Sequence, residues 1–188
     1  MKNLIKILFA VFIFAASVSL AQNDGDYTKN PGYFDFGNLS RYIQGENVTE
    51  VNIDSHLLSL MNGSTDNNKD DFSQLVHGLK LIKVYSFDVK LDEQKELLSK
   101  MNEMDESLVS KNWNRIVKVK VPDEYTFIYI KPAVNNKEIS GLVVATLEKN
   151  GKATFVNIVG NINMNDIGKL SRKFNFPSLD GKDSKKDN

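Results

Sequence analysis

Two histidines are the first residues to consider for metal binding or proton transfer, because imidazole titrates near neutral pH. His56 falls in the first turn of one predicted helix, and His77 falls at the end of another. Neither belongs to an H-x-x-x-H or H-E-x-x-H pattern, and no third ligand accompanies them. The spacing therefore favours two helix-end histidines over a zinc site.

A polar segment from Asp66 to Asp70 places oxygen ligands at alternate positions, as an EF-hand calcium loop does. The pattern fails at the positions with the strictest geometry. The glycine position holds Asp71, and the position of the bidentate glutamate holds His77. The sequence favours a polar loop and a helix that begins at Asp71, with Gln74 in the capping-box position. No metal or cofactor is expected.

Enzyme motifs are missing as well. No serine lies in a G-x-S-x-G or S-x-x-K pattern. The segment from Gly160 to Asn163 matches neither of the phosphate-binding patterns G-x-x-x-x-G-K-[ST] and G-x-G-x-x-G. The chain has no cysteine, which excludes thiolate catalysis and cysteine-based zinc sites. Acidic residues are plentiful, but they fall in helix caps and on exposed helix faces. We therefore expect no catalytic residue, although a site assembled from distant acids remains an alternative.

Charge and aromatic residues indicate little about ligands. The chain has 24 basic and 24 acidic residues, a balance that gives no electrostatic footprint for nucleic acid. Three lysines on neighbouring predicted strands form at most a small basic strip: Lys118, Lys120 and Lys131. Aromatic residues at strand spacing are more typical of a core than of a binding surface. These aromatic residues are Trp113, Tyr125, Tyr129 and Phe155.

The first 21 residues have the order of a secretory signal peptide. Lys2 and Lys6 precede an uncharged run, and Ser19 and Ala21 are small residues before Gln22. We expect residues 1–21 to be a signal peptide, so that the protein is exported and is periplasmic or secreted. The absence of cysteine removes the lipoprotein acceptor, so no stable membrane anchor is expected after cleavage. An uncleaved signal anchor is the alternative.

The remaining chain is long enough for one ordinary domain. Residues 22–47 begin with Asn, Asp, Gly and Pro and are expected to be a flexible N-terminal segment. Residues 48–174 are expected to form a single domain, and residues 175–188 a disordered polar tail rich in Lys, Asp and Ser. No repeat or internal linker divides the domain.

Hydrophobic periodicity predicts alternating strands and helices in this domain. A short helix capped by Asp54 and a long helix from Asp92 have apolar stripes, and a last helix begins at Asn165 or Asp166. The expected strands are 48–53, 81–89, 113–121 and 125–131, followed by a hairpin about Asn150-Gly151. The fold class is α+β, a mainly antiparallel sheet of about five to six strands with helices packed on one face.

The Asn150-Gly151 pair predicts a two-residue type I′ turn. This turn pairs Leu147 with Thr154 and Ala145 with Val156, on a face that belongs to the core. The opposite face is then partly solvated and is the natural docking surface. Its candidate interaction residues are Trp113, Leu142, Val144 and Phe155.

Several segments together resemble the DUF4252 family over roughly residues 48–173. These segments are Val51–Asp54 with Leu57–Leu60, Leu79–Phe87, Trp113–Lys120, Ile139–Val144 and Phe155–Gly160. The resemblance implies an exported bacterial protein of the kind found mainly in Bacteroidetes. It implies no catalytic residue. Members often look like lipoproteins, a feature that this cysteine-free chain lacks.

The sequence thus predicts an exported, non-enzymatic domain that binds an envelope protein or another envelope component. One alternative is a small-molecule or glycan-binding protein, or a hydrolase whose acids and aromatic residues come from distant positions. Another is a structural subunit of a larger envelope complex.

Overall fold

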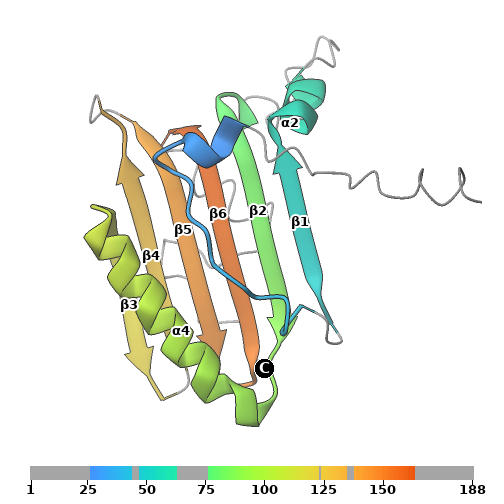
Figure 1. Cartoon of the computed structure of the whole chain (residues 1–188), viewed down its shortest axis with the longest axis vertical. Coiled ribbons are helices and arrows are strands. Elements are labelled where there is room, and N and C mark those ends of the chain that lie inside the picture. The colour runs from blue at the N-terminus through green and yellow to red at the C-terminus, as the bar shows by residue number, and fades with distance from the viewer. Residues whose placement is uncertain (1–25, 44–46, 63–75, 123, 135–137, 164–188) are drawn as a thin grey trace, which may run out of the picture.

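The computed structural model describes residues 26–43, 47–62, 76–122, 124–134 and 138–163. These residues form one antiparallel six-stranded sheet with the strand order β1-β2-β6-β5-β4-β3 (Figure 1). The strands are β1 (Thr49–Asp54), β2 (Leu79–Asp88), β3 (Asn114–Val121), β4 (Glu124–Pro132), β5 (Ile139–Glu148) and β6 (Lys152–Ile162). The helices are the 3-10 turn η1 (Asp26–Lys29), α2 (Ser55–Asn62) and α4 (Leu91–Ser110). The predicted α+β class and antiparallel sheet are confirmed.

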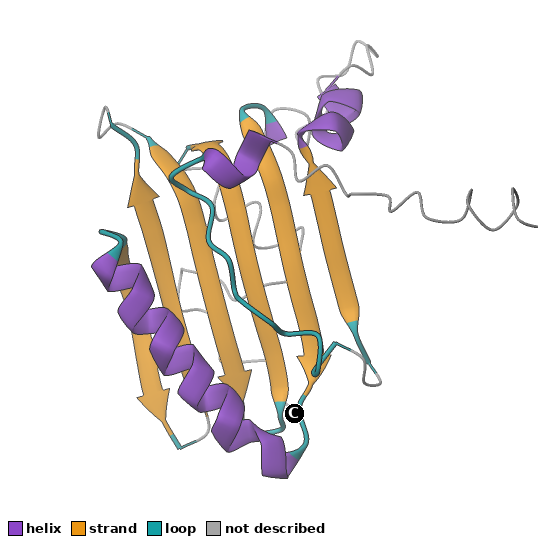
Figure 2. Cartoon of the chain, in the orientation of Figure 1, coloured by secondary structure: helices purple, strands orange, loops and turns teal. Residues whose placement is uncertain are grey.

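Helix α4 covers one face of the sheet over β3, β4 and β5 (Figure 2). Its predicted apolar stripe is confirmed, because Leu97, Met101, Met104 and Leu108 are buried in the cluster beneath it. Asp54 caps α2 as predicted, since its Oδ1 accepts a hydrogen bond from the Leu57 amide at 3.0 Å. Among the described residues, no helix is long and apolar enough to cross a membrane.

Residues 30–43, which we call the strap, run beside α4 on the same face and cross β5, β6 and β2 (Figure 1). The expectation of a flexible segment is wrong for the described part of residues 22–47. Phe34, Phe36, Leu39 and Tyr42 are at most 6% exposed and belong to the main core cluster. Burial of these four apolar side chains orders the segment, although turn-forming residues surround them.

The side chain of Asn157, on β6, fixes the strap to the sheet. Its Oδ1 accepts the Phe34 amide at 2.9 Å, and its Nδ2 donates to the carbonyl of Gly32 at 3.0 Å. Where the strap crosses β5, a Cβ on Gly141 would lie 2.4 Å from the Cα of Gly32. Asn157 is fully buried. Its side-chain amide supplies hydrogen-bond partners for backbone groups of the strap.

The opposite face of the sheet is apolar and buried too. Its members include Ile82, Val84, Leu142, Val144, Val156 and Ile158. Helix α2 adds Leu58 to this cluster. The sheet therefore separates two apolar layers, and its central strands β5 and β6 are buried on both faces.

The predicted register of the last hairpin is wrong by one residue. Leu147 pairs with Ala153 and Ala145 with Phe155. A type I′ turn needs positive φ at both Asn150 and Gly151, but only Gly151 has it, at +89°. The Gly151 amide donates to the Glu148 carbonyl at 2.9 Å, so a three-residue loop replaces the two-residue turn. The slip moves Phe155 to the face under α4 and the strap.

Several predicted features lie outside the described residues. They are the leader (1–21), the polar loop, Asp71 with its capping residue, the last helix after Asn165 or Asp166, and the tail 175–188.

Candidate functional site

The structure does not bring the four predicted interaction residues together. Trp113 and Phe155 lie in the cluster on the α4 face, while Leu142 and Val144 lie in the cluster on the opposite face. All four are at most 5% exposed. The hairpin register and the strap explain this correction, because one moves Phe155 to the α4 face and the other covers it. These four residues therefore do not form an exposed surface.

A buried carboxylate on α4 is the strongest polar feature that sequence reasoning missed. Asp105 lies four residues after Met101 and three before Leu108, on the apolar stripe of the helix. It is 6% exposed. An acid on an apolar stripe requires a partner, because an unpaired buried charge is strongly unfavourable. This acidic residue within the apolar stripe was the sequence signal that could have indicated the site.

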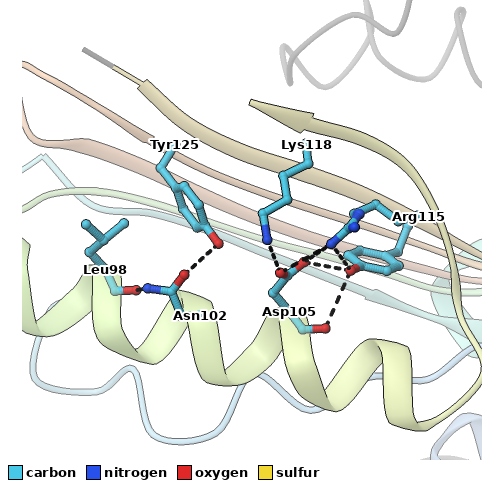
Figure 3. Close-up of polar contacts among 7 residues, drawn as sticks. Leu98, Asn102, Asp105, Arg115, Lys118 and Tyr125 are labelled. Carbon is cyan, nitrogen blue, oxygen red and sulfur yellow. Dashed lines mark hydrogen bonds and ion pairs between the residues drawn. The ribbon is translucent and has the colours of Figure 1, made fainter. Parts of the chain in front are cut away.

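Partners of Asp105 come from β3 and β4 (Figure 3). The Tyr129 hydroxyl donates to Oδ1 at 2.6 Å, and Lys118 Nζ donates to Oδ2. Arg115 Nη1 lies 3.5 Å from both carboxylate oxygens. The Arg115 and Lys118 side chains remain 43% and 34% exposed, whereas that of Asp105 is 8% exposed. One buried anion thus meets two cations at the border of the sheet.

Asp105 and Tyr129 have pKa values shifted away from neutral pH. Burial acts to raise the pKa of Asp105, but hydrogen bonds from Lys118 and Tyr129 and the adjacent positive charges outweigh it, so the pKa is below its ordinary value. Burial and the hydrogen bond to Asp105 raise the pKa of Tyr129 to about 12. A carboxylate that stays ionised and a phenol that stays protonated do not exchange a proton readily at neutral pH. The cluster is suited to anchoring.

Neighbouring contacts anchor the same helix. The Tyr125 hydroxyl donates to Asn102 Oδ1 at 2.9 Å (Figure 3). Lys131 Nζ donates to the carbonyls of Lys111 and Asn112, at 2.6 and 3.3 Å, where its charge favours the carboxyl end of α4. Two of the three lysines of the predicted basic strip, Lys118 and Lys131, thus hold α4 on the sheet. The third, Lys120, lies over the Tyr125 ring, with Nζ 5.8 Å from its centre.

A shallow groove of about 330 Å³ lies between the strap and α4. Its lining residues are Phe34, Asp35, Phe36, Gly37, Asn38, Lys100, Glu103, Met104 and Ser107. Two of its polar groups already serve the turns of the strap. Asp35 Oδ1 accepts the Gly37 amide at 2.9 Å, and Asn38 Oδ1 accepts the Ser40 amide at 3.0 Å. Lys100, Glu103 and Ser107 of α4 supply the other polar side chains of its lining.

The two histidines do not assemble a metal site in the part of the chain that the structure describes. His56 and His77 are both exposed. No group of three or more His, Asp or Glu that could hold a metal ion occurs among the described residues. Asp66 to Asp71 lie outside those residues.

The outer strand β3 leaves one long edge of the sheet without a described neighbour. Lys118 and Lys120 pair with Phe127 and Tyr125 of the α4-face cluster, so the two lysines lie on that face. Arg115 lies there too, opposite Tyr129. Residues of the other set point to the opposite face, as the predicted alternation requires: Val117, Val119 and Val121.

Strand β1 forms the other outer edge. Glu50 pairs with Tyr85, which packs against the α4-face cluster, so Glu50, Asn52 and Asp54 lie on that face. Val51 and Ile53 pack against the opposite cluster. Glu50 and Asn52 are exposed. Polar and apolar residues thus alternate along both edges of the sheet. The charged residues of β3 are basic, whereas the polar residues of β1 are acidic or uncharged.

The chain belongs to the family described as a domain of unknown function, DUF4252, whose family model matches residues 42–170. The resemblance seen in the sequence is therefore confirmed. Neither a curated protein nor a solved structure matches the chain.

Proposed function

We propose that this protein is an exported, non-enzymatic interaction domain that works in the bacterial periplasm or at the cell surface. The charged start, apolar run and small residues of 1–21 support export. The fixed protonation of the Asp105 cluster supports a structural role for its strongest polar site. The protein then acts by binding a partner and not by converting a substrate.

The observation that carries this proposal is the pair of outer strands. A strand at the border of a sheet presents unpaired amides and carbonyls, which can pair with a strand of another chain. On β3, the side chains of Ile116 and Val121 are 43% and 53% exposed. The central strands bury their apolar residues on both faces, so the edges are the parts of the sheet that remain accessible.

Export is tested by the mass of the protein recovered from cell fractions. We expect the periplasmic or secreted form to begin at Gln22, because Ala21 closes the small-residue site. Replacing Ala21 with a bulky residue should retain the leader. Recovery of the full-length chain from the cytoplasm alone would contradict export.

Partner binding is tested by capture from an envelope fraction with the tagged mature chain. Wild type is compared with Lys120→Glu, on the β3 edge, and with Lys95→Glu, on the exposed surface of α4. We expect a bound protein that wild type and K95E retain and that K120E loses. Equal capture by all three, or turnover of a substrate by the isolated chain, would contradict an interaction role for the edge.

A further inference from the structure

We propose that the β3 edge of one copy of this protein pairs with the β1 edge of a second copy, which joins the sheets in a head-to-tail series. The inference rests on the proposed function and deepens it, because it identifies the partner as a second copy of the same chain. It comes from the two sheet edges considered together.

Charge is complementary between the two edges on the α4 face. The β3 edge presents Lys120 there, beside Arg115 and Lys118, which pair with Asp105 of the same chain. The β1 edge presents exposed Glu50 and Asn52 on the same face, and ends at Asp54, whose carboxylate caps α2. Opposite charges in directly facing cross-strand positions are stabilising, whereas like charges are destabilising. A β3–β1 contact is therefore favoured over both β3–β3 and β1–β1 contacts.

Strand direction permits this contact without turning either molecule over. Every neighbouring pair in the six-stranded sheet is antiparallel, so β1 and β3 of one molecule run in opposite directions. Shifting a second copy along the sheet places its β1 antiparallel to β3 of the first. Helix α4 of both copies then lies on the same side of the joined sheet, and the charged faces of the two edges meet.

One register satisfies both faces of the new ladder. When Lys120 faces Glu50 of the second copy, Val119 faces Val51 and Val117 faces Ile53. The apolar residues of both edges then extend the apolar layer on the side away from α4. The register irregularity between Arg115 and Val117 ends regular pairing at that point.

The length and symmetry of this ladder set its strength and its product. Pairing is limited to about five residues on each strand, so the contact is small and depends on protein concentration. The contact uses two different surfaces, so a pair of copies keeps one free β1 edge and one free β3 edge. Such a heterologous interface generates open chains or closed rings. We therefore expect a series of species that grows with concentration.

Charge exchange tests the pairing. Lys120→Glu and Glu50→Lys each place like charges in the ladder, and each should weaken self-association about tenfold, which corresponds to roughly 1.4 kcal/mol. An equimolar mixture of the two variants should associate again, because each supplies the edge that the other needs. The double variant in one chain should also recover. Sedimentation velocity across a wide concentration range measures all four samples.

Two controls have the same charge changes on exposed α4 positions, Lys95→Glu and Glu106→Lys, and should associate as wild type does. Hydrogen exchange provides a second readout. Amides of 49–54 and 117–121 should gain protection as wild type becomes concentrated.

A wild-type chain that stays monomeric throughout the concentration range would overturn this inference. So would association that the α4 controls weaken as much as the edge variants do. If capture from the envelope still depends on Lys120 while wild type is monomeric, the β3 edge binds a different protein. That result would contradict self-association but not the proposed interaction function.

Discussion

The Tyr129 hydroxyl donates to the carboxylate of Asp105 at 2.6 Å, which joins strand β4 to the second half of helix α4. The bond lies beside the apolar stripe of α4, which packs in the same core cluster as Tyr129. Lys118, on the outermost strand, donates to the same carboxylate. The helix and the β3 edge are therefore held in one arrangement through a single side chain.

Asp105→Asn should lower the free energy of unfolding by about 1–2 kcal/mol, because it keeps the shape of the side chain and removes the charge that Lys118 contacts. The loss is moderate because the Lys118 side chain is 34% exposed and can be hydrated. Urea denaturation measures the change, with exposed Glu106→Gln as the matched control. Equal stability of D105N and wild type would show that the ion pairs contribute nothing.

The pH dependence of stability should report the same carboxylate. The pKa of Asp105 is lower in the folded protein than its ordinary value of 3.8. Ionised Asp105 therefore stabilises the fold above pH 3.8, and this contribution is lost as the pH falls from there through the folded-state pKa. The difference in unfolding free energy between wild type and D105N should shrink over that range. A constant difference down to the acid transition would contradict this assignment.

Tyr129→Phe should act at the opposite end of the pH scale. Burial and the bond to Asp105 raise the pKa of Tyr129 from 10.0 to about 12 in the folded protein. Protonated Tyr129 stabilises the fold below pH 10, and the contribution is lost as the pH rises to about 12. Ultraviolet titration of wild type minus Y129F should show one phenol with this raised pKa. A difference titration centred near pH 10 would contradict the buried bond.

Asn157→Ala should detach the strap from β6. The side chain makes three hydrogen bonds, to the Phe34 amide and to the carbonyls of Gly32 and Leu142. Leaving these buried groups unpaired should cost about 2–3 kcal/mol. Hydrogen exchange should show loss of protection at the Phe34 amide. Exposed Asn114→Ala is the control, and equal protection in both variants would remove Asn157 from this role.

Gly141→Ala should strain the crossing of the strap over β5. The added Cβ would lie 2.4 Å from the Cα of Gly32, and both backbones are held by neighbours. Overpacking of this kind costs about 1–3 kcal/mol. The thermal midpoint should fall, and the Phe34 amide, which Asn157 binds next to the crossing, should lose protection from hydrogen exchange. An unchanged thermal midpoint would show that the crossing accommodates the added methyl group.

Local patterns predicted the elements of this fold well because their causes are local. The alternation of Val117, Lys118 and Val119 places them correctly on β3, and Asp54 caps α2. Strand register and the burial of a sheet face by other segments depend on contacts between residues far apart in the sequence. The three-residue loop at Gly151 moved Phe155 to the other face, which no count along the strand reveals.

The candidate site was harder to predict than the fold. Asp105 receives its partners from residues 10 to 24 positions later in the chain, after two strands have paired. Complementary sheet edges likewise appear only when the strand order is known, because β1 and β3 become the two borders through the insertion of β6 and β5. The alternations on β1 and β3 are visible in the sequence, but their pairing is not.

A chain that begins at residue 43, close to the start of the family match at 42, should fail to fold stably. It lacks Phe34, Phe36, Leu39 and Tyr42, all of which are buried against the sheet. Each such side chain contributes about 1.5–3 kcal/mol by burial, so their sum is comparable with the whole stability of an ordinary domain. The truncation also uncovers Phe87 and Phe155, which stack in line with Tyr42.

Circular dichroism and urea denaturation of residues 22–188 and 43–188 check this. The longer chain should unfold cooperatively, and the shorter one should aggregate or show no cooperative transition. Adding a peptide of residues 26–43 should restore part of the transition, because the strap packs as one extended piece. A shorter chain as stable as the longer one would mean that the strap is dispensable to the core.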